Sequence, residues 1–132
     1  MKAYNRKKKK DTLDFEIKFY EELLQKQPNF VQALIVLADA YTKKGYYEKG
    51  LTIDKRLAEL KPDDPIVFYN LACSYSLMNQ IDLSLEALSK AAEHGYDDAA
   101  YMQQDADLYN VRADVRFECL LVQLRSKPPQ PE

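Results

Sequence analysis

The chain has 132 residues, of which 46% are hydrophobic and 30% are charged, and its formal net charge is −2. This balance is typical of a folded domain and excludes a predominantly disordered chain. No stretch approaches the ~20 apolar residues that a membrane-spanning helix needs, and two cysteines are too few for a disulfide framework.

Residues 1–10 form a strongly basic segment that contains six cations and no acid: Lys2, Arg6, Lys7, Lys8, Lys9 and Lys10. The rest of the chain therefore carries −2 − 6 = −8. Because adjacent lysines repel one another, we expect a disordered arm over 1–10. It lacks the apolar core of a secretory signal, which favours a cytoplasmic protein.

Helical periodicity begins after this segment. Residues 12–27 are expected to form one helix, with an apolar stripe made of Leu13, Ile17, Tyr20, Leu23 and Leu24. A second helix is expected over 31–43, because apolar residues recur there every three or four positions. Gly45 ends that helix, since glycine readily adopts the left-handed conformation. A third helix follows and stops before Pro62.

A second helix pair is expected over 65–78 and 83–93. Asp64 and Pro65 provide an acidic cap and a proline in the first turn, and His94-Gly95 closes the pair. Further along, we expect a short helix over 99–104 and a last helix over 115–124, with Asp105 and Asp114 as caps. Arg112 and Arg116 are expected to pair with nearby acids. A proline-rich tail occupies residues 127–132.

The two helix pairs repeat at an offset of 34 residues. Residues 31–64 align with 65–98, so that equivalent positions match as Leu34 with Phe68, Leu37 with Leu71, Ala38 with Ala72 and Tyr41 with Tyr75. Small residues recur at the twentieth position, as Gly50 and Ser84, where two helices must approach closely. The second repeat differs from the first at Asn79, which aligns with Gly45, and at Tyr96, which aligns with Pro62.

These positions resemble the tetratricopeptide repeat. The segment from 95 to 117 also resembles the closing segment of many bacterial arrays of this family. The resemblance implies an all-α superhelical solenoid, with about two full repeats between an N-terminal helix and a C-terminal cap. The expected domain spans 11–126, and Leu108, Phe117, Leu120 and Leu121 are expected to shield its C-terminal end.

Catalysis is not expected. The single histidine, His94, suits a helix C-terminus, and no phosphate loop, nucleophile motif or metal-ligand spacing occurs. Cys73 and Cys119 lie in apolar stretches, which favours two buried free thiols. We therefore expect no cofactor, no metal and no enzymatic activity.

The family resemblance implies instead a protein-interaction module that holds a peptide or protein in a concave groove. The groove positions, lying beside the packing positions on the first helix of each pair, are Gln32, Ile35, Val36, Asp39, Thr42 and Lys43, then Ile66, Tyr69, Asn70, Cys73, Ser76 and Leu77. Gln103 and Gln104 are further candidates. Tyr69 is the expected anchor, because tyrosine offers a large and rigid contact, and Asn70 can bond a peptide backbone.

Three alternatives stay open. The N-terminal helix or the C-terminal segment could cover the groove, or the chain could form a homodimer through the groove or its exposed ends. Residues Lys7–Lys10 could attach to nucleic acid or to an anionic membrane, although the acidic remainder argues against nucleic acid as the main ligand.

Overall fold

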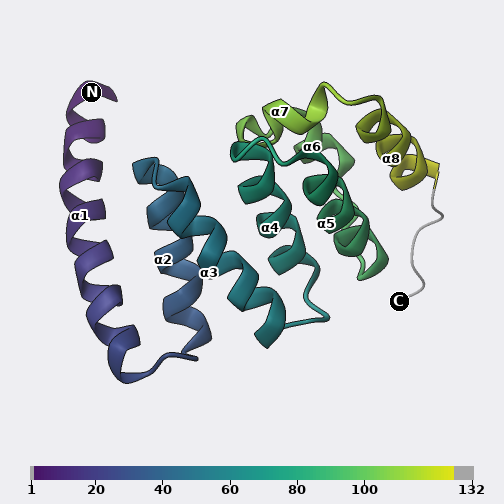
Figure 1. The fold of residues 1–132 in the computed structure, drawn as a ribbon. Coiled ribbons are helices and arrows are strands. Elements are labelled where there is room, and N and C mark those ends of the chain that lie inside the picture. The colour runs from purple at the N-terminus through teal and green to yellow at the C-terminus, as the bar shows by residue number, and fades with distance from the viewer. Residues whose placement is uncertain (1, 127–132) are drawn as a thin grey trace. The chain divides into compact units, whose positions relative to one another are not determined.

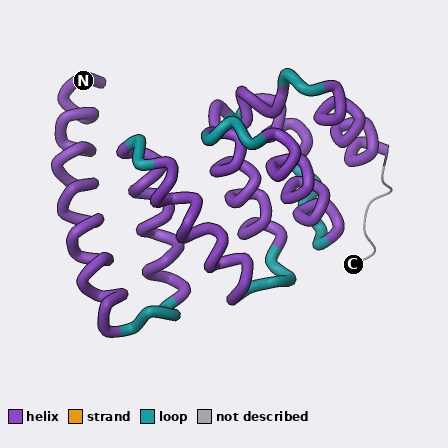
Figure 2. Tube along the Cα trace, viewed as in Figure 1, coloured by secondary structure: helices purple, strands orange, loops and turns teal. Residues whose placement is uncertain are grey.

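The computed structural model describes the backbone of residues 2–126 and the side chains of residues 12–126. Over this range every regular element is a helix, as Figure 2 shows, so the expected all-α class is confirmed. The helices pack in consecutive pairs. The chain divides into two compact units, Met1–Pro62 and Asp63–Glu132, where a single domain over 11–126 was expected. The expected tail, 127–132, lies outside the described residues.

The first unit contains α1 (Lys2–Lys26), α2 (Val31–Lys44) and α3 (Tyr47–Leu60), and α2 packs against both of the others (Figure 1). Its core joins Ile17 of α1 to Leu37, Ala40 and Tyr41 of α2. Two polar contacts reinforce this pair: Tyr41 donates a hydrogen bond to Glu21, and Lys44 Nζ lies 2.6 Å from Asp14 Oδ1. Four of the five residues of the stripe expected on the first helix, Leu13, Ile17, Tyr20 and Leu24, therefore belong to this core.

Two glycines determine how α2 joins α3. Gly45 caps α2 with φ +88°, a conformation that favours glycine, as expected. Gly50 is buried in α3, and a Cβ atom there would lie only 3.0 Å from Oγ1 of Thr42. The small residue at this position thus permits the close approach of the two helices, which confirms the interpretation of the repeat pattern at Gly50.

Residues 2–10 continue α1, so the expected disordered arm is helical in the structure. Lysine and arginine are favourable helix formers, which the expectation of charge repulsion left out. Extending a helix is also much cheaper than nucleating one, and packing already fixes α1 between Leu13 and Leu24.

The second unit contains a helix pair and a closing segment. Its elements are α4 (Pro65–Leu77), α5 (Ile81–Glu93), α6 (Ala99–Gln104), the short 3-10 helix η1 (Ala106–Leu108), α7 (Tyr109–Arg112) and α8 (Val115–Ser126). Asp64 caps α4, because its Oδ1 accepts hydrogen bonds from the amides of Ile66 and Val67 at 2.9 and 3.4 Å. At the close contact of α4 with α5, Ser84 Oγ donates to the Ala72 carbonyl at 2.8 Å.

The departures from the repeat pattern are accommodated locally. Asn79 adopts φ 57°, the left-handed conformation that glycine would take, and asparagine tolerates it better than most residues. His94 caps α5 as expected and stacks on Phe68 at 5.6 Å.

The closing segment follows the expected boundaries. The short helix spans Ala99–Gln104, and the last helix extends two residues past the expected end. The four residues expected to shield this end, Leu108, Phe117, Leu120 and Leu121, are all buried. Cys119 corrects the sequence interpretation: it lies on the exposed face of α8, whereas Cys73 is buried and both thiols are free of disulfide bonds.

Candidate partner-binding faces of α2 and α4

The expected groove residues of α2 share one accessible face. Gln32, Ile35, Asp39 and Lys43 are exposed and Val36 is half-buried. They recur every three or four positions, on the side of the helix opposite Leu37 and Tyr41. The first unit therefore presents two aliphatic side chains beside three polar ones on a helix that is held in place by its buried face.

Asp39 and Lys43 form an ion pair along this face. Lys43 Nζ lies 2.8 Å from Asp39 Oδ2, and both side chains are largely exposed. The hydrogen bond to Asp39 and its charge raise the pKa of Lys43, and the nearby carboxylate of Glu16 acts in the same direction. An exposed pair of this kind contributes little to stability, about 0–1 kcal/mol, so its groups can exchange partners at low cost.

The equivalent face of α4 is different. Ile66 and Asn70 are exposed and Leu77 is half-buried, but Tyr69 and Cys73 are buried. Tyr69, expected to anchor a ligand, therefore has no accessible ring to offer. The residues that cover it come from the closing segment of the same unit, which is one of the alternatives that the sequence left open.

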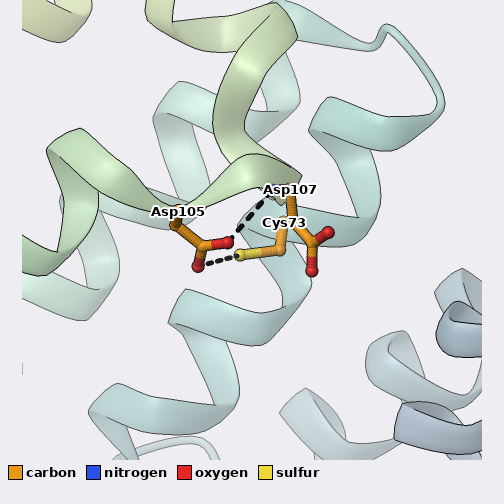
Figure 3. A group of neighbouring side chains, drawn as sticks. All are labelled: Cys73, Asp105 and Asp107. Atoms are coloured by element: carbon orange, nitrogen blue, oxygen red, sulfur yellow. Dashed lines mark hydrogen bonds between the residues drawn. The ribbon is translucent and has the colours of Figure 1, made fainter. Parts of the chain in front are cut away.

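Asp105 is the centre of this cover. It lies between α6 and η1, and its Oδ2 accepts a hydrogen bond from the Tyr69 hydroxyl at 2.7 Å. The same oxygen accepts from the thiol of Cys73 at 3.8 Å, a contact visible in Figure 3. Its other oxygen accepts from the backbone amide of Asp107 at 3.0 Å and so caps η1. One carboxylate thus joins the α4 face to the closing segment.

Aromatic rings complete the enclosure of Tyr69. Its ring stacks on that of Tyr96, with centroids 4.5 Å apart and planes within 10°, and Tyr101 lies tilted at 6.1 Å. Burial raises the pKa of the Tyr69 phenol, with smaller contributions from Cys73 and Asp105. Burial also raises the pKa of Tyr96 to about 12. For Tyr101 the charge of Asp105 is the main cause of a raised pKa.

The rest of the closing segment is hydrogen-bonded to Ser76 of α4. Asn110 Nδ2 donates to the Ser76 carbonyl at 2.9 Å, and Ser76 Oγ accepts from the amide of Val111 at 3.2 Å. Ser76, one of the groove positions expected from the sequence, is therefore used internally. Thr42, its equivalent on α2, donates to the Ala38 carbonyl at 3.0 Å.

The two arginines of the closing segment take different partners. Arg112 donates from Nη1 to the backbone carbonyls of Met102 and Asp105, at 2.9 and 3.1 Å, in place of the side-chain acid that was expected. Arg116 does pair with acids, at 2.7 Å from Asp82 and 2.9 Å from Asp114. Asp114 also caps α8 through the amide of Arg116.

Cys73, Asp105 and Asp107 also bring three potential metal ligands together, with ligand atoms within 4.8 Å of one another (Figure 3). The sequence did not indicate this group, because Cys73 lies about thirty residues from the two acids. A thiolate and two carboxylates suit a divalent cation in type. However, a metal would compete with the phenol, thiol and amide that already donate to Asp105, so we assign this carboxylate the role of holding the closing segment on α4.

Sequence reasoning identified Asp105 as a cap but missed its second role. The cap followed from local spacing, whereas the bonds to Tyr69 and Cys73 depend on where the chain returns after α6. Gln103 and Gln104, considered as additions to the groove, are exposed on α6. Among the described residues, no helix has the length and apolar character required to cross a bilayer.

No family model matches the sequence. Over 86 residues the chain is 35% identical to a chloroplast protein of Arabidopsis thaliana. This similarity covers 63% of the present chain and 26% of that protein, so the chain spans about a quarter of the length of the relative it matches.

Proposed function

We propose that the protein is a tetratricopeptide-like interaction module that binds a peptide or protein through the exposed face of α2. The observation that carries this proposal is the contrast between two equivalent faces. The closing segment occupies the face of α4, whereas Gln32, Ile35, Val36, Asp39 and Lys43 remain accessible on α2. The role is one of binding rather than of catalysis.

The side chains of the α2 face define the kind of ligand that fits it. Ile35 and Val36 offer apolar contact area, and burying an aliphatic side chain contributes about 1.5–3 kcal/mol when the burial is complete. Asp39 and Lys43 pair with each other in the free protein, and each can instead bind an oppositely charged or hydrogen-bonding group of a partner. A short amphipathic segment, with an apolar side chain flanked by polar groups, meets both requirements.

Site-specific photocrosslinking tests this assignment. A photoreactive residue is placed at Ile35 or, as a matched control, at Leu83 of α5, since their exposed fractions are 38% and 41%. We expect a discrete crosslinked partner from position 35, and its loss when Val36→Ser and Asp39→Ala are added. Circular dichroism confirms that each variant stays helical. Equal crosslinking from positions 35 and 83 would show that the α2 face is not the site.

Self-association is a second candidate, favoured by an exposed stripe on α8. Val115, Cys119 and Val122 are exposed, and their spacing places them on one side of the helix. Two copies pairing through this side would bring their Cys119 thiols together. Mild oxidation should then yield a covalent dimer that Cys119→Ser abolishes, and light scattering should detect a dimer without oxidation. A strictly monomeric chain in light scattering excludes this candidate.

A further inference from the structure

The first helix is longer than its packing on α2 requires. Among the side chains that the structure describes, from residue 12 onward, those of α1 that pack on α2 lie between Leu13 and Leu24, and Asp14 meets Lys44, the last residue of α2, at 2.6 Å. A helix rises about 1.5 Å per residue, so α1 continues for roughly 18 Å beyond Asp14, of which residues 2–10 make up about 12 Å. Figure 1 shows the purple N-terminal turns of α1 extending past the end of α2.

This extension carries most of the positive charge of the helix. Residues 2–10 contain six basic residues and no acidic one, whereas the remainder of the protein is acidic. Because the segment is helical, six charges are concentrated along about 12 Å of helix axis. Such a cluster attracts an anionic surface over a distance of about one Debye length, ~8–10 Å at moderate salt.

The acidic residues that follow on α1 are directed toward α2. Asp14 pairs with Lys44, Glu21 accepts a hydrogen bond from Tyr41, and Glu16 acts on the charge of Lys43. The negative charges of Asp14 and Glu16 are therefore partly compensated by the lysines of α2. Residues 11–26 of α1 hold five acids and two lysines, a formal charge of −3, which leaves the +6 of residues 2–10 as the larger charge on this helix.

The opposite side of α1 is aromatic and open to solvent. Phe15 and Phe19 are 71% and 48% exposed, and their rings stack with centroids 6.3 Å apart. Phe15 precedes the buried Ile17 by two residues, which places it about 200° around the helix from the α2 contact. Two neighbouring exposed phenylalanines are costly in water, so their presence beside a basic segment calls for a partner that accepts both.

We propose that α1 is a docking helix for an anionic lipid bilayer surface. The basic residues 2–10 bind the headgroups, while Phe15 and Phe19 enter the boundary between headgroups and acyl chains. A lipid surface accounts for both features, because it offers negative charge and an apolar layer on one plane. Nucleic acid or an acidic protein would use the charge but supplies no comparable layer for two adjacent rings. This docking uses a different helix from the proposed ligand face on α2.

Vesicle sedimentation of the full-length protein tests the proposal. The probes are vesicles of phosphatidylcholine alone and of phosphatidylcholine mixed with phosphatidylserine. We expect binding to the mixed vesicles that weakens as salt rises. Replacing Lys7, Lys8, Lys9 and Lys10 by glutamine should lower the partition coefficient by at least about a hundredfold, since each lysine near such a surface contributes a factor of roughly five.

A control with the same net charge separates position from overall charge. The control replaces four other lysines by glutamine, namely Lys49, Lys55, Lys61 and Lys90, and both quadruple variants have a formal charge of −2 − 4 = −6. We expect the control to bind within about threefold of the parent protein. A third variant, Phe15→Ser with Phe19→Ser, should lose about tenfold in partition at every salt concentration, because it removes apolar burial and leaves the charge unchanged.

The proposal is overturned if the two quadruple variants bind vesicles equally, or if the phenylalanine variant binds like the parent. It is also overturned if a duplex oligonucleotide or polyglutamate binds more tightly than the anionic vesicles in the same buffer, since the occupant would then be another polyanion. Circular dichroism of each variant must match the parent, and Lys→Arg at positions 7–10 should restore binding if charge is the cause.

Discussion

Removing the carboxylate of Asp105 should destabilise the second unit, because this group bonds both α4 and the start of η1. Tyr69 is 5% exposed, and its hydroxyl donates to Asp105 Oδ2 at 2.7 Å. Asp105→Ala removes the charged acceptor of this buried phenol, and a hydrogen bond to a charged group contributes about 1.5–3 kcal/mol. Loss of the cap on η1 adds roughly 1 kcal/mol or less. Because Asp105 keeps some contact with water, we expect a total loss of about 2–3 kcal/mol in the free energy of unfolding.

Urea unfolding of the full chain, followed by circular dichroism, measures this loss. Asp105→Asn should cost less than Asp105→Ala, because the amide oxygen can still accept from Tyr69. A double-mutant cycle with Tyr69→Phe isolates the pair, and we expect a coupling of at least about 1 kcal/mol. A cycle that gives no coupling, or a loss below about 0.5 kcal/mol for Asp105→Ala, would refute the assignment of Asp105 as the residue that holds the closing segment.

Two further changes probe the packing and the titration of the units. Gly50→Ala should change the free energy of unfolding by less than about 1 kcal/mol, because the higher helix propensity of alanine offsets its contact with Thr42 Oγ1. Gly50→Leu should cost about 2 kcal/mol or more in urea unfolding. Equal effects of the two substitutions would contradict close packing of α2 on α3. Alkaline pH should destabilise the protein, since the pKa of Tyr96 is raised to about 12 and that of Tyr69 is also raised, both from an ordinary value of 10.0. The contribution of these two tyrosines to the free energy of unfolding is fully present below about pH 10, where their phenols are protonated in both the folded and the unfolded chain. It is lost as pH rises toward 12, because the unfolded chain then binds fewer protons than the folded one. Tyr69→Phe should reduce this slope in chemical denaturation measured across that range, and an unchanged slope would assign the effect to other groups.

Local sequence patterns predicted the helices and their ends well. Asp64, Gly45 and Asp114 end or begin helices through contacts with residues no more than four positions away, so spacing alone is sufficient to recognise such caps. The buried faces followed from helical periodicity for the same reason. The departure at Asn79 left the turn intact, because asparagine can adopt the conformation that the turn requires.

The errors concern contacts between residues far apart in the chain. Tyr69 occupies a position that is accessible when only the helix pair is considered, and it becomes buried because residues 96–107 return to it. Cys119 was expected to be buried from the apolar character of its helix, but α8 has only one neighbour-facing side and Cys119 lies on the other. For residues 2–10, the prediction considered the repulsion between adjacent lysines. It did not consider that the packed part of α1 supports a helical extension into this segment.

The closing segment covers the face of α4, and its contacts there indicate how a ligand for the α2 face should differ from the closing segment. The offset of 34 residues relates Tyr69 to Ile35 and Cys73 to Asp39. On α4, a phenol and a thiol donate to the carboxylate of Asp105. On α2, the equivalent positions present an apolar side chain and a carboxylate, so this face offers a hydrogen-bond acceptor where α4 offers two donors. A copy of the closing segment, with its acid at this point, would place two carboxylates together on α2 and be repelled. We therefore expect the proposed ligand of the α2 face to differ from the chain's own closing segment and to carry a donor or cation where the closing segment carries Asp105.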